Sequence, residues 1–209
     1  VKVERHGAFI VNDYLQTSDP DIYAAGDCAM VRFNPTGAPA YTPLATNAIR
    51  QGTLIALNIF NQQYPYMGTQ ATSAMKLFGE CVATTGLTLE NAQRHHVPAE
   101  QVVYQGTWRP TYMPSTDPLT IVLVYNPENR RVLGAQLCSK HDVSQSANAV
   151  SVLIQNNNTI DDMAFIDMLF QPNFDFPFNY LNMVAQQAVD KEWQKGNVTP
   201  RHATLGNHQ

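Results

Sequence analysis

The chain has 209 residues, and its 44% hydrophobic and 14% charged content indicates a globular protein of one or two domains. A formal net charge of −4, without a dense run of Lys or Arg, excludes the electrostatic footprint of a nucleic-acid-binding domain. No apolar stretch is long enough to cross a bilayer and the first residues lack a signal-peptide core, so we expect a cytoplasmic protein without a membrane partner.

Residues 1–67 are expected to form a first domain with one well-defined helix. This helix is predicted from Pro43 to Phe60, with Thr42 as its N-cap, because apolar residues recur at the helical period and proline is favoured in the first turn. Upstream, the apolar run at 22–25 is typical of a buried strand that ends in Gly26 and Asp27. Turn-forming residues predict the remaining segments: an extended stretch at 7–11, a turn at 12–13, a loop at 34–39 and a linker at 62–68.

Residues 68–195 form a separate α+β unit, in which we expect an antiparallel sheet combined with helices. The apolar pattern predicts strands at 74–78, 81–85, 101–108, 119–125 and 131–139, the last two joined by a hairpin at 126–130. Helical periods predict helices at 88–95, 143–155, 160–168 and 179–195. Thr88 and Thr159 are the expected N-caps of the first and third of these helices. Residues 196–209 are polar and aperiodic, which predicts a flexible tail.

The cysteines offer no sign of a metal or disulfide site. Cys28, Cys81 and Cys138 are far apart, and no histidine has a Cys or carboxylate at metal-ligand spacing. We therefore expect no metal site, and three reduced thiols packed as small apolar side chains. Although Cys28 follows Asp27 directly, no redox chemistry is assigned to it.

Gly26 and Asp27 are the first candidates for a binding site. Ligands of open α/β sheets lie at the carboxyl ends of strands, where this Gly-Asp pair is expected. A deprotonated Asp27 accepts two hydrogen bonds from neighbouring hydroxyls, and Gly26 leaves the backbone bare for a bulky planar or sugar-like group. The alternative is a plain turn in which the Asp caps the next segment.

The start of the predicted helix, at Leu44, Ala45 and Thr46, is the second candidate. A helix N-terminus presents free N–H groups and the positive end of the helix dipole, which suit an electron-rich acceptor. An ordinary amphipathic helix packed on a sheet has the same sequence pattern. One helix can serve both purposes, since its first turn binds while its outer turns pack.

Residues 167–179 form an aromatic-rich segment with four Phe within nine residues. Pro172 and Pro177 interrupt it, so it is neither a regular helix nor a central strand. Such a segment forms core beneath a loop or part of a subunit interface. Together with the low charge fraction, it leads us to expect a large apolar contact with a second copy of the chain.

The segment at 17–27, TSDPDIYAAGD, resembles the second flavin-binding motif of the pyridine nucleotide–disulfide oxidoreductases, in which this Asp holds the ribityl chain of FAD. The resemblance implies that Gly26 and Asp27 bind FAD and that the backbone of Leu44, Ala45 and Thr46 faces its isoalloxazine ring. Residues 1–67 are then the last piece of an α/β FAD-binding domain, followed by the family's C-terminal dimerisation domain. The family's Gly-rich phosphate loop, its NADH-binding domain and its redox cysteine are expected upstream of Val1, since no GxGxxG occurs here.

The match extends from about Gly7 to Val189 and resembles the C-terminal part of an NADH oxidase or NADH peroxidase. Residues 41–52 and 178–182 are closer to the oxidases, which reduce O2 with NADH through FAD. In related reductases a His-Pro in the aromatic segment reaches the partner subunit's active site, whereas here Gln171, which cannot titrate, precedes Pro172. The resemblance implies that Phe170 and Gln171 line the flavin pocket of the partner in a homodimer, and that this chain holds no catalytic residue.

Three other interpretations stay open. The whole protein is an NADH peroxidase, or it is a coenzyme A disulfide reductase in which Tyr180 is recruited to the site. Alternatively, the chain is a stand-alone, non-catalytic dimerisation module. For an enzyme piece, we expect weak or absent FAD binding and no NADH turnover by this polypeptide alone.

Overall fold

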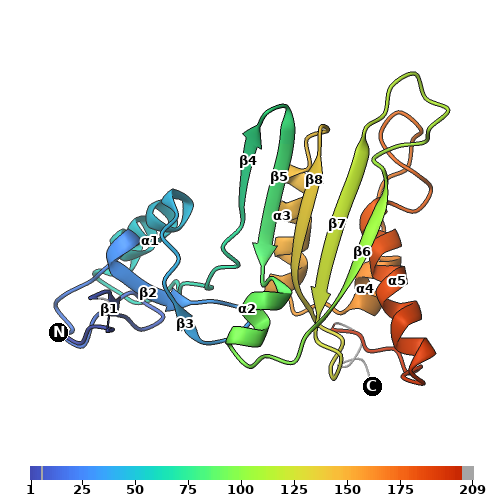
Figure 1. Ribbon diagram of the computed structural model, residues 1–209. Helices are drawn as coiled ribbons and strands as arrows, with labels where there is room; N and C mark the ends of the chain where they lie inside the picture. The colour runs from blue at the N-terminus through green and yellow to red at the C-terminus, as the bar shows by residue number, and fades with distance from the viewer. Residues whose placement is uncertain (6, 204–209) are drawn as a thin grey trace. The chain divides into compact units, whose positions relative to one another are not determined.

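The computed structural model describes residues 1–5 and 7–203, and these divide into two compact units (Figure 1). The first unit runs from Val1 to Ala71 and the second begins at Thr72. The domain boundary predicted after residue 67 lies shortly before this division. No helix within the described residues has the length and apolar character needed to pass through a membrane.

The first unit is built from a small three-stranded sheet and one helix (Figure 1). Its central strand pairs in parallel with one neighbour and in antiparallel with the other. In the order β1-β2-β3, the strands are β1 (Phe9–Ile10), β2 (Ala29–Arg32) and β3 (Pro39–Ala40), and the helix is α1 (Ala45–Asn58). The buried apolar core is small and consists of Leu15, Ala24, Ala29, Val31 and Tyr66.

The predicted strand at 22–25 is wrong. The backbone there is extended, with φ −146° and ψ 163° at Ala25, but it makes only an isolated bridge between Tyr23 and Gln16. A strand is stabilised by neighbours that pair along its length, and the described residues offer this segment no such ladder. Gly26, Asp27 and Cys28 instead form a 3-10 turn, η1, that leads into β2, so Asp27 precedes a strand and does not end one.

The predicted start of α1 is also wrong, because the helix begins at Ala45 and not at Pro43. The N-cap is Leu44 and not Thr42, and Pro43 lies ahead of the helix. Asn47 accounts for the difference, because its side-chain Nδ2 donates to the carbonyl and hydroxyl oxygens of Thr42 at 3.1 and 3.3 Å. These bonds hold Thr42 outside the helix.

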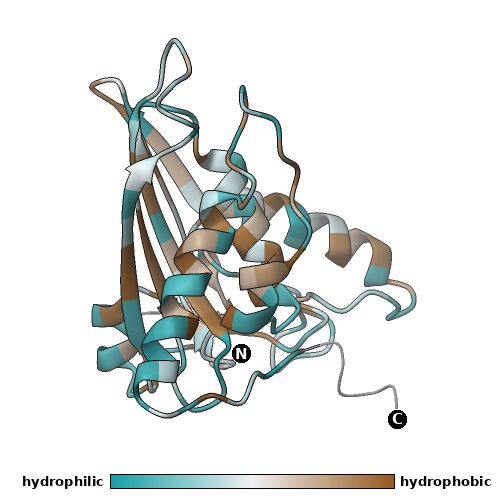
Figure 2. Ribbon diagram, turned by 90° about the vertical axis from the view of Figure 1, so that its right-hand side faces the viewer, coloured by the Kyte–Doolittle hydropathy of each residue, from teal (hydrophilic) through white to brown (hydrophobic). Residues whose placement is uncertain are grey.

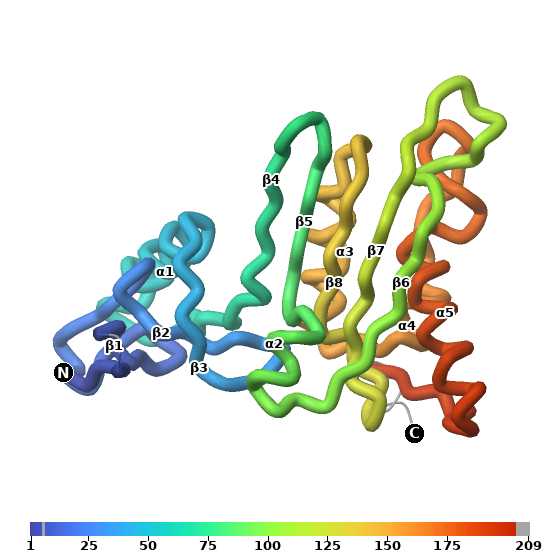
Figure 3. The backbone as a smooth tube through the Cα atoms, viewed as in Figure 1, coloured from blue at the N-terminus to red at the C-terminus, as the bar shows by residue number. Residues whose placement is uncertain are grey.

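A five-stranded antiparallel sheet forms the centre of the second unit, which confirms the predicted fold class (Figures 1 and 3). Burial alternates along its fourth strand, where Leu119, Ile121 and Leu123 are fully buried. In the order β4-β5-β8-β7-β6, the strands are β4 (Ser73–Leu77), β5 (Glu80–Gly86), β8 (Val132–Ser139), β7 (Pro118–Tyr125) and β6 (Glu100–Thr107).

Helices cover one face of this sheet, as the side view in Figure 2 shows. These helices are α3 (Ser144–Gln155), α4 (Ile160–Phe165) and α5 (Tyr180–Gln194), whereas the short helix α2 (Leu89–Arg94) belongs to the connection between β5 and β6. α3 packs on β5 and β8, α5 packs on β6 and β7, and α4 packs against α5. The large core lies between the sheet and these helices, and includes Ile121, Val150 and Val184.

Both threonine caps predicted in the second unit are confirmed. Thr88 Oγ1 accepts a hydrogen bond from Asn91 N at 3.1 Å and begins α2. Thr159 begins α4 with a capping box, in which Thr159 Oγ1 accepts from Asp162 N at 3.1 Å and Asp162 Oδ2 accepts from Thr159 N at 3.0 Å. α4 ends at Phe165, before the predicted Met168, because the backbone of Ile166 leaves the helical region with ψ 140°.

Residues 197–203 lie against the start of α4. Arg201 N donates to Asp161 Oδ2 at 3.1 Å, and Ala203 N donates to Asp162 Oδ2 at 3.0 Å. The carboxylates of α4 therefore hold this part of the predicted tail. Its remainder, residues 204–209, lies outside the described residues.

Candidate functional site

Asp27 lies in the exposed turn η1 at the amino end of β2. Within residues 1–5 and 7–203, its carboxylate has no hydrogen-bond or ion-pair partner. It opens onto a groove of about 790 Å³ in the first unit, lined by Glu4, Arg5, Gly7, Ala8, Asp27, Cys28, Met30 and Tyr41. An unpaired carboxylate at such a groove is available to accept hydrogen bonds from a ligand.

Gly26 allows this turn to lie against α1. Its φ is +70°, a conformation that residues with a side chain rarely adopt, and an added Cβ would lie 3.2 Å from the Cβ of Ala48. Gly26 N donates to the buried Oε1 of Gln51 at 2.6 Å. The glycine therefore brings the backbone of η1 close to the helix, which places Asp27 beside the first turns of α1.

The first turn of α1 has unused hydrogen-bond donors. Leu44 is the N-cap and its side chain caps nothing, while Ala45 and Thr46 are exposed. Within the part of the chain that the structure describes, the amide N–H groups of Ala45 and Thr46 have no acceptor. The start of this helix can therefore donate to an electron-rich group.

Three buried amide side chains on one face of α1 were missed by the sequence analysis: Asn47, Gln51 and Asn58. Asn47 Oδ1 accepts from Thr69 Oγ1 at 3.1 Å, and Asn58 Nδ2 donates to the carbonyl of Tyr64 at 2.7 Å. They link α1 to the segments before and after it. Asn47, Gln51 and Asn58 are four and seven residues apart, which places them on one helical face. This helical spacing of amide residues was visible in the sequence and could have indicated a buried polar face.

In an ordinary amphipathic helix the apolar residues pack on the sheet. Some apolar residues of α1 do not. Leu54 and Ile55 pack against the small core, but Ile49 and Leu57 are exposed, and so is Phe60 just beyond the helix.

The prediction that all three cysteines pack as small apolar side chains is wrong. Cys81 is buried, whereas Cys28 and Cys138 are exposed.

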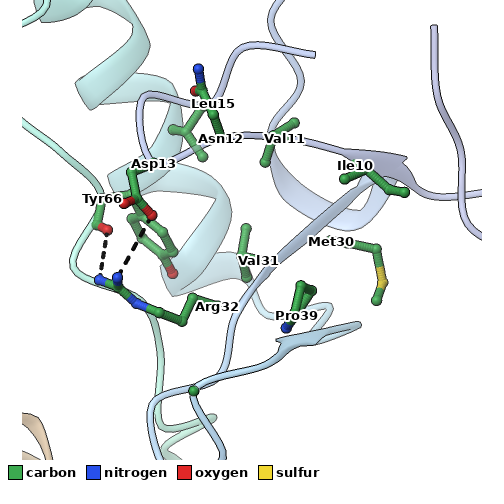
Figure 4. Close-up of a pocket in the computed structure, with 11 residues that line it drawn as sticks. Ile10, Val11, Asn12, Asp13, Leu15, Met30, Val31, Arg32, Pro39 and Tyr66 are labelled. Carbon is green, nitrogen blue, oxygen red and sulfur yellow. Dashed lines mark hydrogen bonds and ion pairs between the residues drawn. The ribbon is translucent and has the colours of Figure 1, made fainter. Parts of the chain in front are cut away.

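A second cavity in the first unit, of about 350 Å³, contains none of the predicted site residues (Figure 4). Arg32 is its cationic group, but the guanidinium is 3.7 Å from the carboxylate of Asp13 and donates to the carbonyl of Tyr66 at 3.4 Å. Figure 4 shows these two contacts as dashed lines. The charge of Arg32 is already matched within the protein, so this cavity has no clear preference for a charged ligand.

Residues 166–179, called the aromatic loop from here on, connect α4 to α5 and have no regular secondary structure, as predicted. Gln171 organises its central turn: Gln171 Oε1 accepts from Asn173 N at 2.7 Å, and Gln171 O accepts from Phe174 N at 2.7 Å. The loop exposes several large apolar side chains, namely Ile166, Leu169, Phe170, Phe174 and Phe178.

Asp175 is the buried anchor of the aromatic loop. It is only 3% exposed, and its carboxylate accepts hydrogen bonds from Phe176 N and from the side chain of Asn179. Burial raises the pKa of Asp175 to about 7, because the loss of water disfavours the charged form more than these bonds favour it. The carboxyl therefore changes its charge near neutral pH.

Tyr180 follows the aromatic loop and is 7% exposed. Its hydroxyl shares a hydrogen bond of 2.6 Å with Ser146 Oγ on α3, and burial raises its pKa. A phenol in this position is part of the core and is not accessible to a ligand at the surface. The geometry gives no support to the hypothesis that Tyr180 is recruited to a substrate site.

Residues 72–178 match the family model of the pyridine nucleotide-disulphide oxidoreductase dimerisation domain, which is just over half of the chain. Residues 1–52 match the model named pyridine nucleotide-disulphide oxidoreductase. The chain belongs to the pyridine nucleotide-disulphide oxidoreductases. The family and the fold class predicted from the sequence are thereby confirmed.

Several relatives of this chain are NADH oxidases. An NADH oxidase of Enterococcus faecalis is 47% identical over 88% of this chain and 42% of that protein. The structure of the water-forming NADH oxidase from Lactobacillus brevis bound to NADH has a TM-score of 0.93 and 53% identity, over 94% of this chain and 44% of that chain. A coenzyme A disulfide reductase of Staphylococcus aureus is 28% identical over 90% of this chain and 43% of that protein. The chain therefore spans about two fifths of the length of these curated relatives.

The predicted site residues of this oxidoreductase chain fall into two groups. Gly26 and Asp27 lie on η1, which contacts the helix whose first turn carries Leu44, Ala45 and Thr46. Gly26 contacts this helix: its N–H donates to Gln51, and an added Cβ would lie 3.2 Å from Ala48. Phe170 and Gln171 lie in the aromatic loop of the second unit, where Phe170 is exposed and Gln171 holds the turn.

Proposed function

We propose that this chain is the C-terminal part of a flavoprotein NADH oxidase, which reduces O2 with NADH. The observation that carries the proposal is the likeness to the Lactobacillus brevis oxidase, which extends over almost the whole chain. The chain supplies one wall of the FAD pocket and a subunit interface, and NADH binds to the part of the protein that the relatives have in addition. No residue of this chain is proposed to be catalytic.

The first unit has groups that fit FAD. The unpaired carboxylate of Asp27 suits ribityl hydroxyls, and the free N–H groups of Ala45 and Thr46 suit the electron-rich edge of the flavin ring. The positive end of the α1 dipole adds about 0.3–1 kcal/mol for a negative charge at this edge. We infer that Gly26, Asp27 and the backbone of residues 44–46 hold the cofactor. When bound, FAD accepts the hydride of NADH, while the protein supplies position and electrostatics.

The exposed face of α1 supports the proposal that the first unit belongs to a larger domain. Ile49 and Leu57 are exposed there and Phe60 is 96% exposed, while the residues that α1 buries are polar. Large apolar side chains gathered on one helical face mark a surface that other polypeptide covers. We infer that the remainder of the FAD-binding domain covers this face in the whole protein.

The aromatic loop supports the formation of a homodimer. Leu169, Phe174 and Phe178 are each at least half exposed, which is unusual for large apolar side chains outside an interface. The match to the family's dimerisation domain includes most of the loop. We infer that the loop contacts a second copy of the chain, and that Phe170 and Gln171 line the flavin pocket of that partner.

A coenzyme A disulfide reductase is the second candidate, because a protein of that name is among the relatives. The buried hydroxyl of Tyr180 makes this candidate weaker than the oxidase. An NADH peroxidase would use the same flavin contacts and differ in its electron acceptor. A stand-alone dimerisation module would need neither a flavin nor NADH.

Oxygen uptake and flavin content test the proposal. The 209-residue chain mixed with FAD and NADH is expected to consume no oxygen, whereas the protein encoded by the full-length gene is expected to be yellow and to consume oxygen with NADH. In the full-length protein, Asp27→Ala is expected to lower FAD retention, while Asp21→Ala, an exposed acid on the same segment, is expected to leave it unchanged. A colourless full-length protein, or sustained uptake by the 209-residue chain, would contradict the proposal.

A further inference from the structure

Arg109 lies two residues after the end of β6, in the connection to β7, next to the aromatic loop. Figure 3 shows these two connections side by side at the same end of the sheet. The guanidinium Nη1 of Arg109 donates to the carbonyl of Asn173 at 3.1 Å, across 64 residues of sequence. Arg109 therefore links the β6–β7 connection to the centre of the aromatic loop.

The guanidinium is fixed by two further bonds on its own side. Arg109 Nε donates to the carbonyl of Ser115 at 2.6 Å, and Nη2 donates to Ser115 Oγ at 2.7 Å. The group is planar and its donors point in fixed directions. Because Ser115 occupies two of these directions, the direction of the third donor, toward Asn173, is also set.

The guanidinium also contacts an aromatic ring. Its carbon lies 4.4 Å from the ring centroid of Trp108, in a cation–π contact. Trp108 also stacks with His141, just beyond the end of β8, with ring centroids 3.9 Å apart and planes within 5°. Arg109 is thereby linked through Trp108 to the end of β8 and not only to its own connection.

Asn173 transmits this restraint to the exposed part of the loop. Asn173 N donates to Gln171 Oε1, and Gln171 O accepts from both Phe174 N and Asp175 N, at 2.7 and 2.9 Å. Holding the carbonyl of Asn173 therefore holds the turn that begins at Gln171. Phe170 immediately precedes this turn.

We propose that Arg109 is a positioning residue: through Asn173 it fixes the aromatic loop in the form in which Phe170 and Gln171 reach the flavin of the partner subunit. The inference rests on the proposed function, in which these two residues line that pocket. Arg109 itself touches no reacting group. A lysine at this position keeps the charge but cannot donate in three fixed directions, so it should replace Arg109 only in part.

Amide hydrogen exchange in the 209-residue chain tests the first half of the inference. Arg109→Ala is expected to speed exchange at Phe174 N and Asp175 N about tenfold or more, since a hydrogen bond from a charged donor is lost from the turn. Arg109→Lys is expected to give an intermediate effect. The control is Arg94→Ala, which removes an exposed arginine whose one ion pair, with Glu90 at 2.6 Å, lies on α2. Unchanged exchange in Arg109→Ala would overturn the inference.

The emission of Trp108 provides a second readout in the same chain. The protein has two tryptophans, so Trp193→Phe leaves Trp108 as the only one. In that background, Arg109→Ala is expected to shift or change the intensity of the emission, because the stacked cation is removed. Emission identical to that of the parent would show that the stack does not form.

The full-length protein tests the second half. Arg109→Ala is expected to lower kcat by up to about a hundredfold, with KM for NADH unchanged, and to alter the visible circular dichroism of the flavin. Arg109→Lys should restore part of kcat and part of the circular dichroism signal, and Arg94→Ala should leave both unchanged. If the unmodified protein is yellow and active but Arg109→Ala matches it, the inference fails and the proposed function stands. If the unmodified protein is colourless, the proposed function fails and this half of the inference fails with it.

Discussion

The buried ion pair between Arg130 and Asp161 offers the sharpest test of the energetics of the second unit. Arg130 Nε and Nη2 donate to the two carboxylate oxygens of Asp161 at 2.6 and 2.7 Å. The side chains are 0% and 5% exposed, so neither charge has access to water. The pair joins the β7–β8 hairpin to the start of α4.

The magnitude follows from this burial. Arg130→Met removes one charge and leaves the carboxylate of Asp161 buried without its partner, which costs about 3–5 kcal/mol. Asp161→Asn likewise leaves the guanidinium of Arg130 buried without its charged partner, at a similar cost. The double variant removes both charges, so we expect it to lose less stability than the sum of the two single variants.

Urea unfolding followed by far-UV circular dichroism measures these losses. At about 2–4 °C per kcal/mol, either single variant should also unfold roughly 6–20 °C lower than the unmodified chain. The control is Arg94→Met, because the side chains of Arg94 and Glu90 are 69% and 72% exposed and their pair should contribute less than about 1 kcal/mol. A loss below about 1 kcal/mol for Arg130→Met, or strict additivity in the double variant, would refute the reasoning.

Two further variants test the anchor of the aromatic loop and the turn that carries Asp27. The folded carboxyl of Asp175 has a pKa raised to about 7, so it binds a proton more tightly than in the unfolded chain, and its contribution to stability is lost as pH rises from about 4 to 7. Asp175→Asn should therefore gain up to about 3 kcal/mol relative to the unmodified chain between pH 5 and pH 8, measured by urea unfolding; a pH-independent difference would disprove the raised pKa. Gly26→Ala should destabilise the first unit more than Gly37→Ala, because both have φ +70° but only a Cβ at Gly26 meets another residue, Ala48 at 3.2 Å. Limited proteolysis compares the two, and equal susceptibility would mean that η1 does not lie against α1.

Local patterns in the sequence were sufficient to predict most of the second unit. The apolar content of residues 119–125 predicted a strand that the structure confirms as β7, and Thr88 and Thr159 predicted the starts of two helices. These features depend on neighbours within a few residues of each other, such as a cap that accepts the N–H three residues later. The family was likewise recognisable from one short segment.

The same short segment shows the limit of local patterns. Residues 22–25 have the composition of a strand, yet they lack a ladder partner among the described residues, and Asp27 is placed by a turn instead. Strand formation depends on a second segment that the strand's own sequence does not specify. The resemblance assigns the candidate site a place along the chain, but it did not predict that Asp27 lies in a turn ahead of a strand.

Which polar side chains have buried partners depends on how distant segments of the chain pack. Gln51 accepts from Gly26 across 25 residues, Arg130 binds Asp161 across 31, and Arg109 reaches Asn173 across 64. The family, most elements of the second unit and the irregular backbone of the aromatic loop were predictable from the sequence. The sequence could not determine these pairs, because a polar side chain can be satisfied by water or by many other groups, and only the packed chain selects one of them.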